Sequence, residues 1–304
     1  MAGIIGVGSE SQLVWPGIEA VFGMGYNRYD PEYARVFDIM KSDKNYEKMV
    51  NHYGLNLVPI KPEGKAVDYD DMAQGPAVIF QHQTYASGFI ITREAVEDNL
   101  YKEVAAQRAQ ELGTKMRITK EVVCANVLNR AFNSSYAGGY DNLSLANTAH
   151  LLSKGGTVSN MLSTSAPLSE AALETLVIQI NKLVDDASIR IKVLPRLLVI
   201  PPDLQFEAER ILKSQLRVGT ANNDANAMLN MGSIMEGFTV NHYLTSSSQY
   251  YLMTDAMYGL TLFQRRAVET ENDTDFDSEN MKFKVSERFV VGWADYRTLM
   301  ASGN

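Results

Sequence analysis

The sequence predicts an α+β fold drawn out along one long helix, and three observations support this interpretation. A helical pattern of roughly 40 residues, or roughly 60 Å, runs from Thr92 to about Asn133. A short apolar strand at 196–200 lies between two helical segments. The C-terminal residues alternate between apolar and polar side chains, which is typical of a sheet with one buried and one solvent-exposed face.

The first 52 residues are rich in aromatic side chains and show little periodicity. They contain one short helical segment, 31–40, for which Asp30 is placed as the cap. A segment of this kind does not easily form its own core, so we expect an arm that packs on something else, such as another subunit. Gly3, Gly6 and Gly8 lack the spacing of a phosphate-binding loop.

A long hairpin is predicted next. Leu55–Ile60 and Ala77–Phe89 have strand-like composition, and the polar residues at about 61–71 form the tip between them. Two-stranded ribbons are only marginally stable alone, so this one is expected to lie on a partner surface. His82 in the second strand is expected to be solvated or at an interface, because no second metal ligand stands at a useful spacing.

The long helix is predicted to be one-sided. Thr92 is placed to cap its N-terminus, Lys120 interrupts its apolar stripe, and Gly113 is compatible with a bend. The stripe consists of Val96, Leu100, Val104, Leu112, Met116, Val123 and Val127. Because sustained heptads are lacking, we interpret the helix as the spine of an elongated subunit and not as half of a coiled coil. Cys124, the only cysteine, is expected to be a buried thiol.

A compact α/β unit follows a loop rich in glycine, serine and asparagine. Ser169 is predicted to begin a helix that runs from Glu170 to about Asp186, and a further helix spans Asp203 to Lys213. Between them lies the strand Arg196–Ile200. His150, in the loop before the unit, would need an orienting acid or a nucleophile for any catalytic use. The stretch 218–237 is expected to be an exposed loop.

The chain closes with strands. Short β signals occur at 238–244, 249–254 and 260–265, and residues 267–271 and 281–292 are predicted to form a hairpin around an acidic turn. In that turn Asp273, Asp275 and Asp277 resemble the start of a calcium loop. Ser278 and Lys284 stand where the loop needs glycine and glutamate, so we favour a solvated acidic turn, with an intermolecular metal site as the alternative.

Composition excludes several classes of protein. The 304 residues are 45% hydrophobic and 21% charged, no apolar run approaches the ~20 residues of a membrane helix, and the N-terminal residues lack secretory features. We therefore expect residence in a cytoplasm. The net charge of −8 argues against tight nucleic-acid binding and leaves weak, sequence-independent contact open.

No familiar catalytic or nucleotide-binding motif occurs, and the four histidines are scattered. We accordingly expect no enzyme activity, and no catalytic, cofactor-binding or metal-binding residues. Carboxylate chemistry around Asp203 and Glu207, or at the turn 273–277, is the enzymatic alternative; loss of an activity on mutating these acids, with assembly unchanged, would favour it.

The order of these parts resembles the major capsid proteins of tailed bacteriophages, with the Hong Kong 97-type fold. Three stretches carry the resemblance: SGFIITREAVEDNLY at 87–101, LLVIPPDLQFEAERIL at 197–212, and the closing strands from about 263. The resemblance covers the chain from about Tyr53 onward. It implies an N-terminal arm at 1–52, an extended loop formed by a β-hairpin at 53–91, the spine helix and peripheral domain at 92–166, an axial domain at 167–247, and the rest of the peripheral domain at 248–304.

The same resemblance implies self-assembly into pentamers and hexamers of an icosahedral shell around double-stranded DNA, in a virion assembled in the host cytoplasm. It implies a portal, decoration or cement proteins and no membrane. No long charged helix precedes the arm, so we expect a separate scaffolding protein or a processed chain. Lys61 and Lys65 match the loop that some members cross-link, although solvated lysines are the simpler interpretation. A bacterial nanocompartment of the same fold, of the encapsulin type, is the alternative function.

Overall fold

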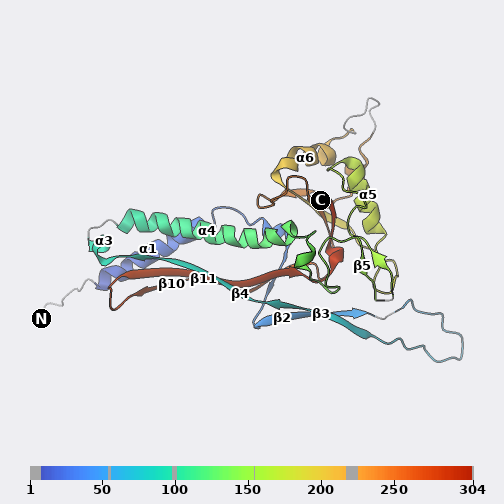
Figure 1. Cartoon of the computed structure of the whole chain (residues 1–304), viewed down its shortest axis with the longest axis horizontal. Coiled ribbons are helices and arrows are strands. Elements are labelled where there is room, and N and C mark those ends of the chain that lie inside the picture. Colours follow the sequence, from blue (N-terminus) through green and yellow to red (C-terminus); the bar gives the residue numbers. More distant parts are fainter. Residues whose placement is uncertain (1–7, 54–55, 98–100, 154, 217–224, 303–304) are drawn as a thin grey trace.

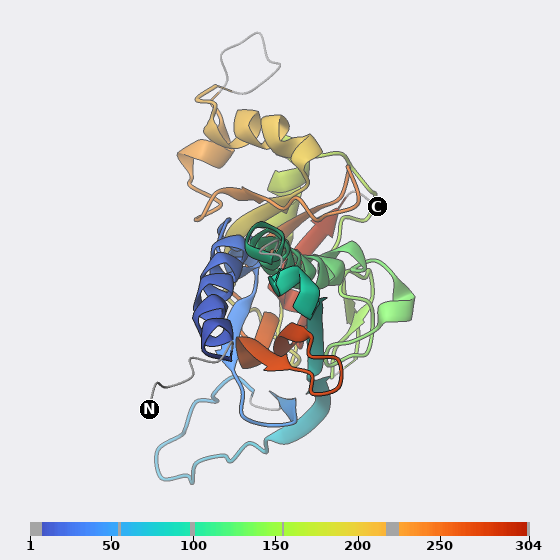
Figure 2. The same cartoon turned by 90° about the vertical axis from the view of Figure 1, so that its left-hand side faces the viewer.

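The computed structural model describes residues 8–53, 56–97, 101–153, 155–216 and 225–302. Figure 1 shows an elongated body in which two helices lie along a long sheet, with a compact unit at one end and a two-stranded ribbon projecting from the junction. Seen from the end of the long axis, the two helices lie side by side above the strands, and the compact unit rises on their far side (Figure 2). The chain therefore has the elongated shape predicted from its long helix.

The spine is helix α4, Tyr101–Asn129, which is preceded by the short helix α3, Arg93–Glu97. The Oγ1 atom of Thr92 accepts a hydrogen bond from the backbone N–H of Ala95, which confirms the predicted cap. At its C-terminal end the spine is shorter than expected, because α4 has 29 residues and ends at Asn129. Residues 98–100, between α3 and α4, lie outside the described residues. Asn133 does not continue it; its side chain caps a 3₁₀ turn at Ser134–Tyr136. None of the described helices is long and apolar enough to cross a membrane.

The long sheet has the strand order β1-β10-β11-β4, with β1 (Asp38–Lys41) parallel to β10 and the other pairs antiparallel. Strands β10 (Leu260–Thr274) and β11 (Met281–Trp293) form the predicted C-terminal hairpin and extend it at both ends. The strand β4 (Gln83–Ile91) pairs with β11 along its whole length. One face of this sheet packs under the helices through a buried cluster that includes Phe22, Met116, Phe283 and Val285.

The N-terminal segment, expected to pack on something else such as another subunit, packs on the spine of its own chain. Helix α1, Gly8–Tyr26, lies along α4 of its own chain, with Ile18 and Phe22 buried. An added Cβ at Gly113 would lie 2.4 Å from the carbonyl oxygen of Phe22, so this glycine permits the close packing of α1 on α4, and α4 continues through it. The predicted helix at 31–40 shrinks to α2, Tyr33–Val36, because β1 begins at Asp38.

The close approach of the two helices gives a test. We expect Gly25→Ala to lower the free energy of unfolding by about 1–3 kcal/mol, because its Cβ would lie 2.2 Å from the carbonyl oxygen of Gln110. Gly23→Ala, on the same helix, meets nothing within 4 Å among the described residues and should raise the stability by up to about 1 kcal/mol. Urea titration of both variants measures the difference; equal effects would contradict this packing.

The compact unit is built on a sheet of order β12-β9-β7-β8, flanked by the helices α5 (Glu170–Asn181) and α6 (Gln205–Lys213). Its remaining strands are β8 (Phe238–Val240), β9 (Tyr250–Thr254) and β12 (Leu299–Ser302). The predicted central strand is confirmed as β7, Pro195–Ile200. The Ser169 side chain accepts from the N–H of Ala172, as expected for the cap of α5.

Two predictions in the compact unit need correction. Helix α5 ends at Asn181, before the predicted Asp186, and Lys182 already departs from helical geometry. Asp185 lies beyond the helix, in a turn where its carboxylate accepts from the N–H groups of Ala187 and Ile189. The predicted exposed loop at 218–237 contains helix α7, Ala227–Asn230, whose Met228 is buried in the core of the unit. The part of that loop at 217–224 lies outside the described residues.

The ribbon consists of β2 (Tyr46–Tyr53) and β3 (Ala73–Gln81), which pair antiparallel. A hairpin with a long connection is confirmed, but its predicted strands at 55–60 and 77–89 are misplaced. Residues 56–60 form no strand, and the second stretch is divided at His82 into β3 and β4, which pair with different partners. Two short strands, β5 (His150–Leu151) and β6 (Thr157–Val158), pair in the loop after the spine.

Candidate assembly surfaces

The connection at the tip of the ribbon exposes large apolar side chains. Val58, Ile60 and Tyr69 are each more than 90% exposed, at 93%, 94% and 94%. The carboxylate of Asp70 accepts from the backbone N–H of Asn56 at 2.7 Å and from its side-chain amide at 3.1 Å, which ties the two sides of the connection together. An apolar surface of this kind, on a segment that projects from the body, is typical of a site that other chains cover.

The ribbon is held on the body near its root and again further along β2. The Phe80 ring packs against the Phe263 ring at a centroid distance of 5.3 Å in a small buried cluster. The side-chain amide of Asn51 donates to the Asp186 carboxylate at 3.0 Å, which links β2 to the compact unit. The ribbon therefore presents its apolar tip from a fixed base, and Lys61 and Lys65 lie exposed in the same connection.

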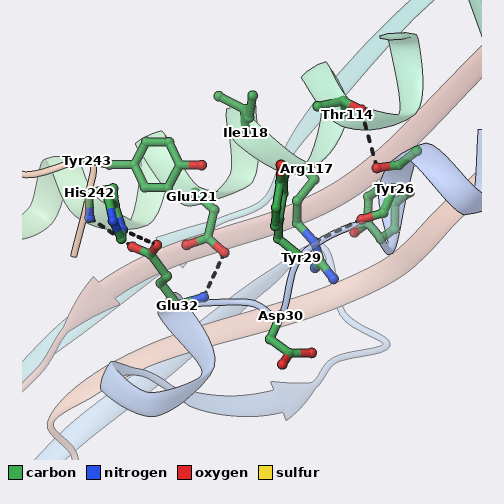
Figure 3. A pocket seen from close by; sticks show the side chains of 11 residues that line it. Tyr26, Tyr29, Asp30, Glu32, Thr114, Arg117, Ile118, Glu121, His242 and Tyr243 are labelled. Carbon is green, nitrogen blue, oxygen red and sulfur yellow. Dashed lines mark hydrogen bonds and ion pairs between the residues drawn. The ribbon is translucent and has the colours of Figure 1, made fainter. Parts of the chain in front are cut away.

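A second surface feature is a pocket of about 290 Å³ beside the middle of the spine (Figure 3). The Glu121 carboxylate, on α4, accepts from the backbone N–H groups of Glu32 and Tyr33 at 2.9 and 3.1 Å. Glu32 in turn pairs with His242 at 2.6 Å. Burial raises the pKa of Glu121 and the two N–H bonds oppose that rise. These contacts join α2 and the compact unit to the spine.

The acidic residues singled out in the sequence do not converge on one site. The Asp275 carboxylate accepts from Ser278 and pairs with Lys282, and these contacts lower its pKa and keep it charged. Glu207 pairs with Arg210 on the outer side of α6, and Asp203 is exposed at the start of that segment. Across the described residues, no group of three or more histidine, cysteine or acidic residues is arranged to hold a metal ion.

Sequence similarity identifies the family of this chain. A family model described as phage capsid protein matches residues 76–301, which is most of the chain. The chain belongs to the phage capsid protein family. A search of curated protein sequences finds no relative. The matched region begins in β3 and runs through β12, so it includes the spine, the long sheet and the compact unit.

Solved structures share the fold of this capsid protein at low sequence identity. The procapsid of bacteriophage JBD30 matches with a TM-score of 0.54 and 13% identity, over 99% of this chain and 76% of that one. A virus-like particle from Pyrococcus furiosus matches with a TM-score of 0.51 and 10% identity, over 94% and 97%. The capsid of a native GTA particle matches with a TM-score of 0.52 and 9% identity, over 90% and 91%. The fold is thus the Hong Kong 97-type capsid fold.

Two histidines of the capsid protein are buried. His82, expected to be solvated or at an interface, is 5% exposed and so is not solvated; its side chain packs at the root of the ribbon. His150 is fully buried, and the Asp141 carboxylate lies 2.5 Å from its Nδ1. The orienting acid that catalysis would need is present, but the Nε2 of His150 faces the Asn160 side-chain oxygen at 3.1 Å and its ring stacks on Tyr296. This arrangement is that of a packed structural histidine.

The capsid protein also buries an ion pair. In the sequence only one member of it was noticed, Lys120, as an interruption of the apolar stripe of the spine. The Lys120 ammonium, on α4, pairs with the Glu287 carboxylate on β11, and their side chains are 2% and 0% exposed. Lys120 also lies over the rings of Tyr33 and Phe289, at 5.2 and 5.1 Å. Cys124, one turn further along, is buried as expected, and burial raises the pKa of its thiol. The pair fixes the spine on the long sheet.

Proposed function

We propose that this capsid protein is the major shell subunit of a tailed bacteriophage, and that its pentamers and hexamers close an icosahedral shell around double-stranded DNA. The observation that carries the proposal is the apolar connection at the ribbon tip of a chain in the phage capsid family. Fully burying one large apolar side chain contributes about 1.5–3 kcal/mol. Many such contacts per subunit stabilise a closed shell through avidity.

The proposed division of labour follows the elements. The ribbon and its tip serve as the extended loop, the spine with the long sheet as the peripheral domain, and the compact unit as the axial domain. In this proposal β9 and β12, which the sequence assigned with 248–304 to the peripheral domain, belong to the axial domain because they share its sheet. We propose a separate scaffolding protein, a portal and decoration proteins as partners, with assembly in the host cytoplasm. The net charge of −8 is compatible with a shell that contacts packaged DNA weakly and without sequence preference.

An enclosing nanocompartment is the second candidate, because a virus-like particle shares the fold. That likeness, at 10% identity, supports the fold alone, whereas the family model favours a phage shell. The two functions differ in content. Particles produced with the phage would enclose DNA, and nanocompartments would co-purify with a protein cargo.

The decisive experiment changes the ribbon tip. We expect the triple variant Val58→Ser, Ile60→Ser, Tyr69→Ser to fold with unchanged unfolding midpoint, since all three side chains are more than 90% exposed, and to lose shell formation. Negative-stain microscopy and light scattering after size-exclusion chromatography measure assembly. The matched control, Glu63→Ser with Asp68→Ser in the same connection, should assemble like the wild type. Normal shells from the triple variant would contradict the role of the tip.

A further inference from the structure

Both strands of the ribbon leave the long sheet at the same level. On one side β1 ends at Lys41, the backbone N–H of Ser42 donates to the carbonyl oxygen of Gln264 at 3.0 Å, and β2 begins at Tyr46. On the other side His82 is the single residue between β3 and β4. Its neighbours pair with different strands: Gln81 with β2 of the ribbon, and Gln83 with β11 of the long sheet. His82 is thus the joint between the two.

One side-chain hydrogen bond connects the two crossing points. The Nε2 of His82 lies 3.0 Å from the Oγ of Ser42, and that hydroxyl donates its only proton to Glu47 at 2.7 Å. The hydroxyl must therefore accept from the imidazole, which places the proton of the neutral ring on Nε2. The buried Nδ1 has no hydrogen-bond partner among the described residues. Protonation of Nδ1 would place a positive charge on the buried ring and create an N–H group with no hydrogen-bond acceptor among the described residues.

The charges around the joint act in the same direction. Arg265 on β10 donates to the backbone oxygen of Asp43, and Arg288 on β11 donates to the side chain of Asn45, so both guanidinium groups lie at the crossing. Burial lowers the pKa of His82, and Arg288 and then Arg265 lower it further, against the opposing effect of Glu47. The folded joint therefore favours the neutral imidazole.

We propose that His82 is a pH-sensitive joint, which holds the ribbon on the body while its ring is neutral and releases the ribbon when the ring takes up a second proton. Release requires the contacts of Phe80 near the root and of Asn51 further along β2 to open. Because the open state has the ordinary histidine pKa of about 6.5, the stabilisation is complete above that value and declines as the pH falls below it. One linked proton increases the opening equilibrium by at most about tenfold per pH unit.

Hydrogen–deuterium exchange of the full-length, unassembled subunit between pH 7.5 and 5.0 tests the proposal, with rates corrected for intrinsic exchange. In the wild type, the opening of β2 and β3 should rise by up to about tenfold per unit below pH 6.5, while β9 stays protected. His82→Gln keeps a donor for Ser42 and does not titrate, so its ribbon should not respond to pH. The matched control is His52→Gln, an exposed histidine on the same ribbon, which should behave like the wild type.

Three results would overturn the proposal. These are a wild-type ribbon equally protected at every pH, the same acid response in His82→Gln, and equal loss of protection in β9, which would indicate global unfolding. A second measurement uses the wild type alone. The histidine resonance that is absent from His82→Gln should titrate below pH 6.5, over the same range as ribbon opening; titration at or above the ordinary value would also refute the joint.

Discussion

Replacing Lys120 with alanine is expected to lower the free energy of unfolding of the subunit by about 3–5 kcal/mol, because it leaves the Glu287 carboxylate buried without its cation. Glu287 is 0% exposed, and Gln264 also donates to its Oε1, at 3.2 Å. Its second oxygen has no partner among the described residues. Urea denaturation followed by circular dichroism measures the loss.

The control for this prediction lies one turn away. Lys115→Ala removes an exposed lysine from the same helix and should change stability by less than about 0.5 kcal/mol. The double variant Lys120→Met, Glu287→Leu removes both charges and should recover most of the stability, since a buried pair replaced by apolar side chains is often neutral or stabilising. A single variant as stable as the double one would show that Glu287 does not depend on Lys120.

Asn160→Ala is expected to lower the unfolding free energy by about 3 kcal/mol or more. The side-chain amide of Asn160 is fully buried and donates to the carbonyl oxygens of Leu145, Tyr296 and Leu299. Its oxygen accepts from the N–H of Asn147 and faces His150. Each buried partner left unsatisfied costs about 1–3 kcal/mol. The same urea titration measures the effect.

Asn147→Ala is the matched comparison, because its half-buried side chain makes one bond to Ser144 and one to the N–H of Ala149. We expect it to cost about 1 kcal/mol. Asn160→Asp should be at least as damaging as Asn160→Ala, since a carboxylate would face three carbonyl oxygens. Similar stability for all three variants would contradict the central role of Asn160.

Elements defined by local pattern were predicted well. The cap at Ser169, the apolar strand at 196–200 and the C-terminal hairpin depend on residues near one another in sequence, and all three are present. The spine was found for the same reason, although its length was overestimated, because helical periodicity does not reveal that the Asn133 side chain caps a separate turn.

Features that depend on distant partners were missed. Lys120 and Glu287 are 167 positions apart. The sequence therefore showed Lys120 as an interruption of the apolar stripe of the spine and did not indicate the carboxylate that pairs with it. His82 was expected to be solvated or at an interface, and the sequence did not show that it lies between the end of one paired strand and the start of another. The exposed ribbon tip was anticipated only as a polar turn, since the apolar residues 57–60 were assigned to a paired strand.

Strand β7 has a consequence for how the subunit responds to load. Leu197 and Val199 pack into the core beneath the spine, while Leu198 and Ile200 pack into the core of the compact unit. Neighbouring residues of one six-residue strand thus belong to two hydrophobic cores. Unfolding either core would expose residues of β7 that pack in the other, so the two cores should unfold together. A shell subunit under outward pressure from its contents would therefore respond as one cooperative body and not as two loosely linked halves.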